Sequence, residues 1–240
     1  MARPKIVLFG DSITQRSFEP GGWGAALTNT FSRKADVIVR GYGGYNTKLA
    51  LFLLDETFPT NCTKPPVAVT VFFGANDAAL LGRNNEQQHV PIAQYKENLL
   101  KIVYHIKESI PAVLVVLITP PPVDEVGRIE YARSLYGENA KPPERTNEMA
   151  GMYAKTCMEV AAELNVPSIN LWSKMQETPD WQKYLCDGLH LTEEGNAVVH
   201  GEVVKVLASG GLHAPGMPYD FPHHSQIDFE KPEEAFKKQR

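Results

Sequence analysis

Short apolar runs recur along the chain, and stretches with a helical spacing of apolar residues separate them. The runs are rich in valine, isoleucine, leucine and phenylalanine, which is typical of strands buried on both faces of a sheet. Three of them stop just before a glycine or a proline. This pattern predicts five strands, at residues 5–9, 37–40, 67–73, 112–118 and 168–170.

Between the runs, apolar residues three or four positions apart predict amphipathic helices. One apolar stripe covers residues 95–110 and a second covers 153–164. A last helix is expected from Glu193 to Leu207, with acidic residues in its first turn, where the helix dipole favours them. Strands that alternate with helices predict the α/β class, with a parallel sheet covered by helices on both faces.

Two segments fall outside this alternation. Residues 120–143 are polar and rich in proline, and they are too long for a plain connection, so we expect a surface excursion near the functional site. The chain from Gly210 onward predicts an extended segment with a short helix after Pro232. No second domain is indicated. We therefore expect one domain over residues 1–240, with residues 210–240 as a C-terminal extension.

Composition and charge exclude several classes of function. The net charge is −4, so no basic surface for nucleic acid is expected. No apolar segment is long enough for a signal peptide or a membrane span. Cys62, Cys157 and Cys186 lack the spacing of a disulfide framework or a zinc site. We expect a cytoplasmic protein with no bound metal; whether it forms a homo-oligomer is left open.

Four polar or glycine-rich clusters adjoin the predicted strands and the last helix. Ligands in an open parallel sheet bind beyond the carboxyl ends of the strands, so we expect these clusters to converge on one rim. The clusters are Gly10-Asp11-Ser12-Ile13, residues 41–47 (GYGGYNT), Gly74-Ala75-Asn76-Asp77 and Asp187-Gly188-Leu189-His190.

The residue types in these clusters fit nucleophilic catalysis. A serine hydroxyl such as that of Ser12 needs an adjacent base, which His190 supplies. Asp187, three residues earlier, is placed to hold the imidazole in the required tautomer. The Ser12 N–H, a glycine N–H of the second cluster and the Asn76 amide are candidate donors to an oxyanion.

Each cluster also has a purely structural interpretation. The first is compatible with a helix N-cap, Asn76-Asp77 with a second cap or a turn, and Asp187 with His190 in a structural turn. The glycines of the second cluster are compatible with tight backbone geometry alone. All four clusters would have to fall by chance at their matching places, so their combination favours the catalytic interpretation.

In order and position, the four clusters resemble the four sequence blocks of the SGNH/GDSL hydrolases, from residue 5 to about 207. The resemblance implies a flavodoxin-like, three-layer α/β/α fold with a five-stranded parallel sheet, and ester hydrolysis without a cofactor. It assigns Ser12, Asp187 and His190 as the catalytic triad, and Ser12, Gly44 and Asn76 as the oxyanion hole.

At two positions the match to the family's sequence blocks is less exact. Ile13 stands where the family name has leucine. In the second block Gly44 fits best, with Gly43 as the alternative and Gly41 less suitable.

The residues 44–47 (GYNT) are similar to the isoamyl acetate-hydrolysing esterase branch. The likeness implies a small-molecule ester as substrate, with a short acyl group such as acetyl. A lysophospholipase, a thioesterase or a sugar-ester deacetylase with the same triad is an alternative, as is lipid degradation more broadly. A non-catalytic binding module with this fold is the alternative from a different class.

Overall fold

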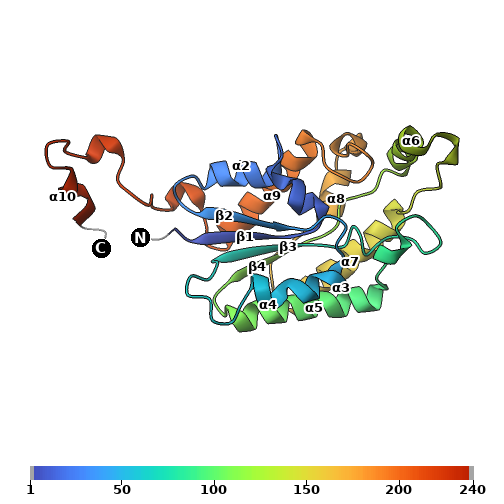
Figure 1. Cartoon of the computed structure of the whole chain (residues 1–240), viewed down its shortest axis with the longest axis horizontal. Coiled ribbons are helices and arrows are strands. Elements are labelled where there is room, and N and C mark those ends of the chain that lie inside the picture. Colours follow the sequence, from blue (N-terminus) through green and yellow to red (C-terminus); the bar gives the residue numbers. More distant parts are fainter. Residues whose placement is uncertain (1–2, 238–240) are drawn as a thin grey trace.

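A parallel sheet of five strands lies between two layers of helices in the computed structural model, which describes residues 3–237 (Figure 1). Its spatial order, β2-β1-β3-β4-β5, is the flavodoxin-like order, so the predicted fold is confirmed. All neighbouring strands run parallel. The strands are β1 (Lys5–Gly10), β2 (Asp36–Gly41), β3 (Ala68–Phe72), β4 (Leu114–Ile118) and β5 (Ser168–Ile169).

Helices cover both faces of this sheet (Figure 1). One layer comprises α3 (Thr47–Ala50), α4 (Leu54–Thr57), α5 (Ile92–Ser109) and α7 (Asn147–Glu163). The opposite layer comprises α2 (Trp23–Thr30), α8 (Leu171–Gln176) and α9 (Glu193–Ser209). Three shorter or peripheral helices complete the chain, namely α1 (Ser12–Gln15), α6 (Glu125–Tyr136) and α10 (Pro232–Lys237).

Alternation along the strands explains why the apolar runs are unbroken. Val7 and Phe9 of β1 face the core beneath α5 and α7, whereas Ile6 and Leu8 face the core beneath α2 and α9. Because both faces of a strand are covered, every position must be apolar. The stripe predicted over residues 95–110 is the buried face of α5.

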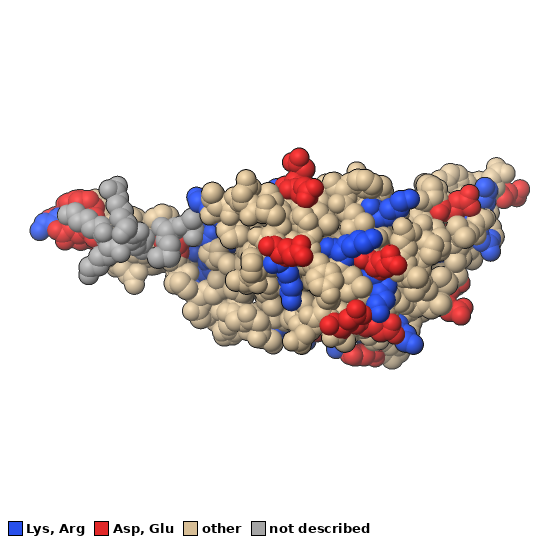
Figure 2. Space-filling model, turned by 90° about the horizontal axis from the view of Figure 1, so that it is seen from below, with Lys and Arg blue, Asp and Glu red and all other residues tan. Residues whose placement is uncertain are grey.

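The outer surface of the α5 layer carries both signs of charge. Figure 2 shows basic and acidic side chains interspersed there, without a single basic patch. Lys96 of α5 pairs with Glu163 of α7 at 2.8 Å. This distribution agrees with the mildly acidic composition. In residues 3–237, the helices are all too short or too polar to cross a bilayer.

The excursion at residues 120–143 differs from its prediction because it contains a helix. Asp124 caps α6 by accepting a hydrogen bond from the Val126 N–H at 3.2 Å. No residue of α6 is buried, so its sequence has no apolar stripe by which a helix could have been predicted. The excursion nevertheless reaches the candidate site through Arg128, which contacts Asp187 and also Glu144, the residue that follows the excursion.

The C-terminal segment leaves the body at the amino-terminal edge of the sheet. The Asp220 carboxylate accepts hydrogen bonds from Arg3 at 2.7 Å and from Arg33 at 3.2 Å. Arg3 also contacts Asp36, the first residue of β2, at 3.1 Å. The short helix expected after Pro232 is α10.

Candidate active site

Ser12 is the first residue of α1 and follows β1 directly. Asp11 caps this helix, since its Oδ1 accepts a hydrogen bond from the Ile13 N–H at 2.9 Å. Burial raises the pKa of the Asp11 carboxyl to about 6. The N-cap interpretation of the first cluster therefore applies to Asp11, and it leaves the half-buried hydroxyl of Ser12 free for chemistry.

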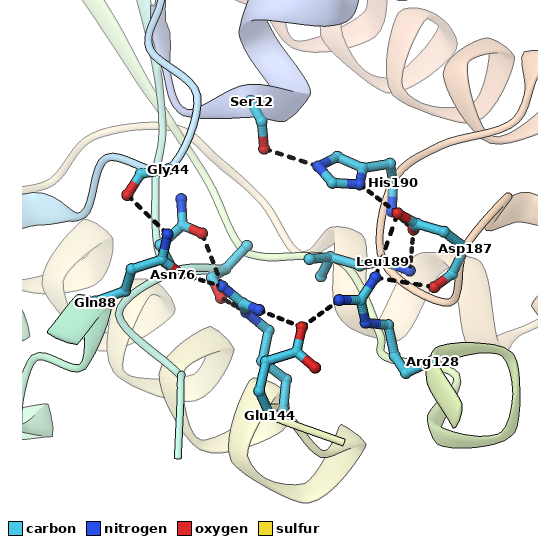
Figure 3. A network of polar contacts seen from close by, with 11 residues as sticks. Ser12, Gly44, Asn76, Gln88, Arg128, Glu144, Asp187, Leu189 and His190 are labelled. Carbon is cyan, nitrogen blue, oxygen red and sulfur yellow. Dashed lines mark hydrogen bonds and ion pairs between the residues drawn. The ribbon is translucent and has the colours of Figure 1, made fainter. Parts of the chain in front are cut away.

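Ser12, His190 and Asp187 form one line of polar contacts (Figure 3). Ser12 Oγ lies 2.9 Å from His190 Nε2, and His190 Nδ1 lies 2.7 Å from Asp187 Oδ2. An ionised carboxylate only accepts hydrogen bonds, so the ring proton belongs on Nδ1. His190 Nε2 is then able to accept the proton of the Ser12 hydroxyl.

The charge of Asp187 is stabilised from several sides. Burial opposes ionisation, but hydrogen bonds from His190 and the positive charge of Arg128 hold the pKa of Asp187 well below its usual range. Its Oδ1 also accepts hydrogen bonds from the N–H groups of Leu189 at 3.0 Å and His190 at 2.7 Å. Asp187 is therefore a carboxylate at neutral pH.

Gly44 and Asn76 lie across from this line (Figure 3). Gly44 has a φ of +77°, in the left-handed region that glycine tolerates best. Its N–H has no hydrogen-bond partner in residues 3–237, whereas the Gly43 N–H donates to Gln15 Oε1 at 2.6 Å. Asn76 Nδ2 donates to Tyr45 O at 2.8 Å, which leaves its second hydrogen available.

Asp77 joins the second cluster to the third. Its carboxylate accepts hydrogen bonds from the N–H of Thr47 at 3.0 Å and from the Thr47 hydroxyl. Asn98 donates to that hydroxyl at 3.1 Å. Burial raises the pKa of Asp77 to about 7. This contact holds the start of α3 against the loop that carries Asn76.

A cavity of about 190 Å³ opens beside His190. Its walls are partly apolar and partly charged, and they include Ile13, Pro20, Leu191, Arg16, Glu19 and Glu193. Over the described part of the chain, no three His, Cys, Asp or Glu residues are grouped so that they could hold a metal ion.

All five residues predicted for the site thus lie around one space. The sequence analysis did not identify four further polar residues beside them, namely Gln88, Arg128, Glu144 and Arg145. They come from loops and from the solvent-exposed α6, and no spacing in the sequence connects them with the four clusters.

Similarity to known proteins assigns the chain to a family. The family model described as GDSL-like lipase/acylhydrolase matches residues 6–203. A GDSL esterase/lipase of Arabidopsis thaliana is 61% identical over 236 residues, which cover 98% of each chain. The isoamyl acetate-hydrolyzing esterase 1 homolog of Homo sapiens is 39% identical over 232 residues, 96% of this chain and 90% of that protein.

A solved structure agrees with these sequence relatives. The lipase/acylhydrolase from Enterococcus faecalis has a TM-score of 0.66 and 29% identity, covering 86% of this chain and 96% of that one. A three-layer α/β fold with these four blocks at the carboxyl edge of its sheet is that of the GDSL hydrolase class. The chain belongs to the GDSL-like lipase/acylhydrolase family, as its sequence blocks predicted.

Proposed function

We propose that this protein is a serine esterase that hydrolyses small esters with a short acyl group, using Ser12 as nucleophile. Carboxylic ester hydrolysis is the class of reaction to which its GDSL esterase/lipase relatives belong. The observation that carries the proposal is the continuous contact from Ser12 through His190 to Asp187, at 2.9 and 2.7 Å.

Each of the three residues has a defined task in acylation. Ser12 Oγ attacks the acyl carbon while its proton passes to His190 Nε2. Asp187 stabilises the imidazolium that results. The tetrahedral intermediate collapses when the bond to the alcohol oxygen breaks and His190 returns the proton to that oxygen, which leaves an acyl-Ser12 ester.

Deacylation repeats these steps with water as the nucleophile. His190 takes a proton from the water, the hydroxide attacks the acyl carbon, and the acid leaves as the proton returns to Ser12 Oγ. In both tetrahedral intermediates the oxyanion accepts hydrogen bonds from the Ser12 N–H, the Gly44 N–H and Asn76 Nδ2. The pairing of the Gly43 N–H with Gln15 supports Gly44 as the glycine donor.

The names of relatives support a short acyl ester as substrate. Relatives in human, cow and mouse carry the name isoamyl acetate-hydrolyzing esterase 1 homolog, at 37–39% identity. The cytoplasmic location remains a prediction from the sequence.

Hydrolysis of p-nitrophenyl acetate, butyrate and octanoate by the wild type and by Ser12→Ala tests this proposal. We expect kcat/KM of the wild type to decrease with acyl length. In Ser12→Ala, kcat/KM should be lower than in the wild type by at least about 10⁴-fold. Unchanged turnover in folded Ser12→Ala would exclude this nucleophile. A maximum at octanoate would favour the lysophospholipase or thioesterase alternative. A wild type that hydrolyses none of the three esters and does not react with a fluorophosphonate probe would favour a binding module.

A further inference from the structure

Arg145 is a buried cation next to the proposed oxyanion hole. Its side chain is 4% exposed, and it lies in the loop directly before Thr146, the N-cap of α7. Nε donates to Ala75 O at 2.6 Å, and Nη1 donates to Glu144 Oε1 at 2.7 Å. Nη2 donates to Asn76 Oδ1 at 2.9 Å and to Gln88 Oε1 at 2.6 Å.

The contact with Asn76 fixes the direction of its amide. A guanidinium has donors and no acceptor, so only the oxygen of the amide can face Arg145. A flipped amide would set NH₂ against N–H groups in a buried place and leave both sides without partners, which is costly. Asn76 Nδ2 must therefore face Tyr45 O and the space in front of Ser12 (Figure 3).

The contact with Gln88 carries the same influence to Gly44. Gln88 accepts from Arg145 through Oε1 and donates through Nε2 to Gly44 O at 3.2 Å. The backbone carbonyl of Gln88 also accepts a hydrogen bond from Asn46 Nδ2 at 2.8 Å, which holds the two segments together. One guanidinium thus contacts Asn76 directly and, through Gln88, the carbonyl of Gly44, which belongs to the peptide that follows the Gly44 N–H.

Charge compensation makes a buried guanidinium tolerable at this position. Glu144 lies between Arg145 and Arg128 and contacts both. Arg128 in turn contacts Asp187 Oδ2 at 3.3 Å (Figure 3). Positive and negative groups therefore alternate from Arg145 to Asp187, which offsets part of the cost of burying each charge.

We propose that Arg145 is a positioning residue of the oxyanion hole, which orients the Asn76 amide directly and restrains Gly44 through the hydrogen bond from Gln88 to its carbonyl. This inference rests on the proposed function. Arg145 reaches the site only through these partners, so its loss should lower kcat and leave KM for a small ester nearly unchanged.

A double-mutant cycle on p-nitrophenyl acetate tests the role of Arg145. Arg145→Lys keeps the charge but loses the fork of donors, and we expect kcat to decrease about tenfold to a hundredfold with KM within about threefold. Asn76→Ala should cost about 10²-fold to 10³-fold. In the Asn76→Ala background, Arg145→Lys should cost at least about threefold less than in the wild type, because the amide that it orients is absent and only the route through Gln88 remains.

Two further variants guard against misfolding and indirect effects. Gln88→Leu removes the link to Gly44 without changing a charge, and we expect kcat to decrease about tenfold. This variant tests the proposal independently if Arg145→Lys does not fold. Arg33→Lys is the matched control, since Arg33 pairs with Asp220 at the opposite edge of the sheet. Its kcat should equal that of the wild type, and circular dichroism and thermal unfolding establish folding for each variant.

The cycle separates this inference from the proposed function. If the wild type is inactive or Ser12→Ala is active, the proposed function is wrong. If Ser12→Ala and Asn76→Ala are impaired but Arg145→Lys and Gln88→Leu keep kcat within threefold, only the inference about Arg145 is wrong. A loss from Arg145→Lys that is equally large with and without Asn76 would show a general structural role and would also overturn it.

Discussion

The two sides of the active site are held in place by different means. On the triad side, His190 and Asp187 are three positions apart, and one turn joins them by two hydrogen bonds that His190 donates to the Asp187 carboxylate. On the oxyanion side, Asn76 is bonded to Arg145, 69 positions away, and Gly44 to Gln88, 44 positions away. A local turn organises one side, and contacts between distant loops organise the other.

This difference implies that substitutions on the two sides of the active site should have different effects. A turn whose carboxylate accepts its own backbone N–H groups forms largely independently of the rest of the fold. The position of an amide that depends on a buried guanidinium changes when any member of the network changes. Changes on the triad side should therefore remove chemistry while leaving the structure intact, whereas changes on the oxyanion side should act on the geometry.

After Ser12→Ala, the largest effect on activity is expected from Asp187→Asn. The asparagine retains an oxygen for the N–H groups of Leu189 and His190 but no longer holds His190 in the required tautomer, so kcat should decrease about 10³-fold to 10⁴-fold. Because the pKa of Asp187 lies well below its usual range, its carboxylate is ionised throughout pH 6 to 9, and a loss should be measured at every pH in this range.

Rates over this pH range, with thermal unfolding of the same samples, check the role of Asp187. Asp180→Asn is the matched control, since Asp180 is exposed and its ion pair with Lys183 lies outside the triad, and its kcat should be unchanged. A loss below tenfold in Asp187→Asn would show that His190 is oriented without this carboxylate.

A smaller effect is expected from Gly44→Ala, with Gly43→Ala as its control. A side chain at φ +77° is strained, so the Gly44 peptide should rotate and kcat should decrease about tenfold to a hundredfold. At Gly43 a Cβ would meet only the flexible tip of Gln15, at 3.0 Å, so kcat should stay within about threefold. Kinetics of the pair on p-nitrophenyl acetate check this, and the reverse order of effects would assign the donor to Gly43.

The smallest effect on activity is expected from Asp77→Asn, which instead changes the pH dependence of stability. The pKa of Asp77 is raised to about 7 by burial, so the folded state binds its proton more tightly than the unfolded state. Its contribution to stability is complete below about pH 4 and decreases as the pH rises through about 7.

Urea unfolding at pH 5 and pH 8 measures this contribution. The free energy of unfolding of the wild type should decrease relative to Asp77→Asn by on the order of 2 kcal/mol between these values. The carboxyl of Asp11 is present in both proteins, and because its charge raises the pKa of Asp77, the difference includes the interaction between the two carboxyls. If the free energy of unfolding changed equally with pH in the wild type and in Asp77→Asn, Asp77 would be ionised in the folded protein at both pH values.

The sequence predicted the sheet and the triad because both leave local patterns. Strands buried on both faces are continuous apolar runs, and Asp187 and His190 lie within one short motif. The same reasoning missed α6, which buries no residue and so has no apolar stripe.

The choice between Gly43 and Gly44 could not be made from the sequence either. It depends on whether the Gln15 side chain accepts a hydrogen bond from one of the two N–H groups, which is a contact between α1 and a loop 28 positions further along the chain. Arg145 and Gln88 were missed for the same reason, because long-range pairing leaves no periodicity in either segment.

The anchoring of Asp220 has a practical consequence. Arg3 and Asp36 place that anchor at the amino ends of β1 and β2, whereas Ser12 follows the carboxyl end of β1, about 20 Å away along a strand of six residues. An affinity tag or a solid support attached through the C-terminal segment would therefore sit behind the enzyme, and an immobilised layer would present its catalytic face to the surrounding solution.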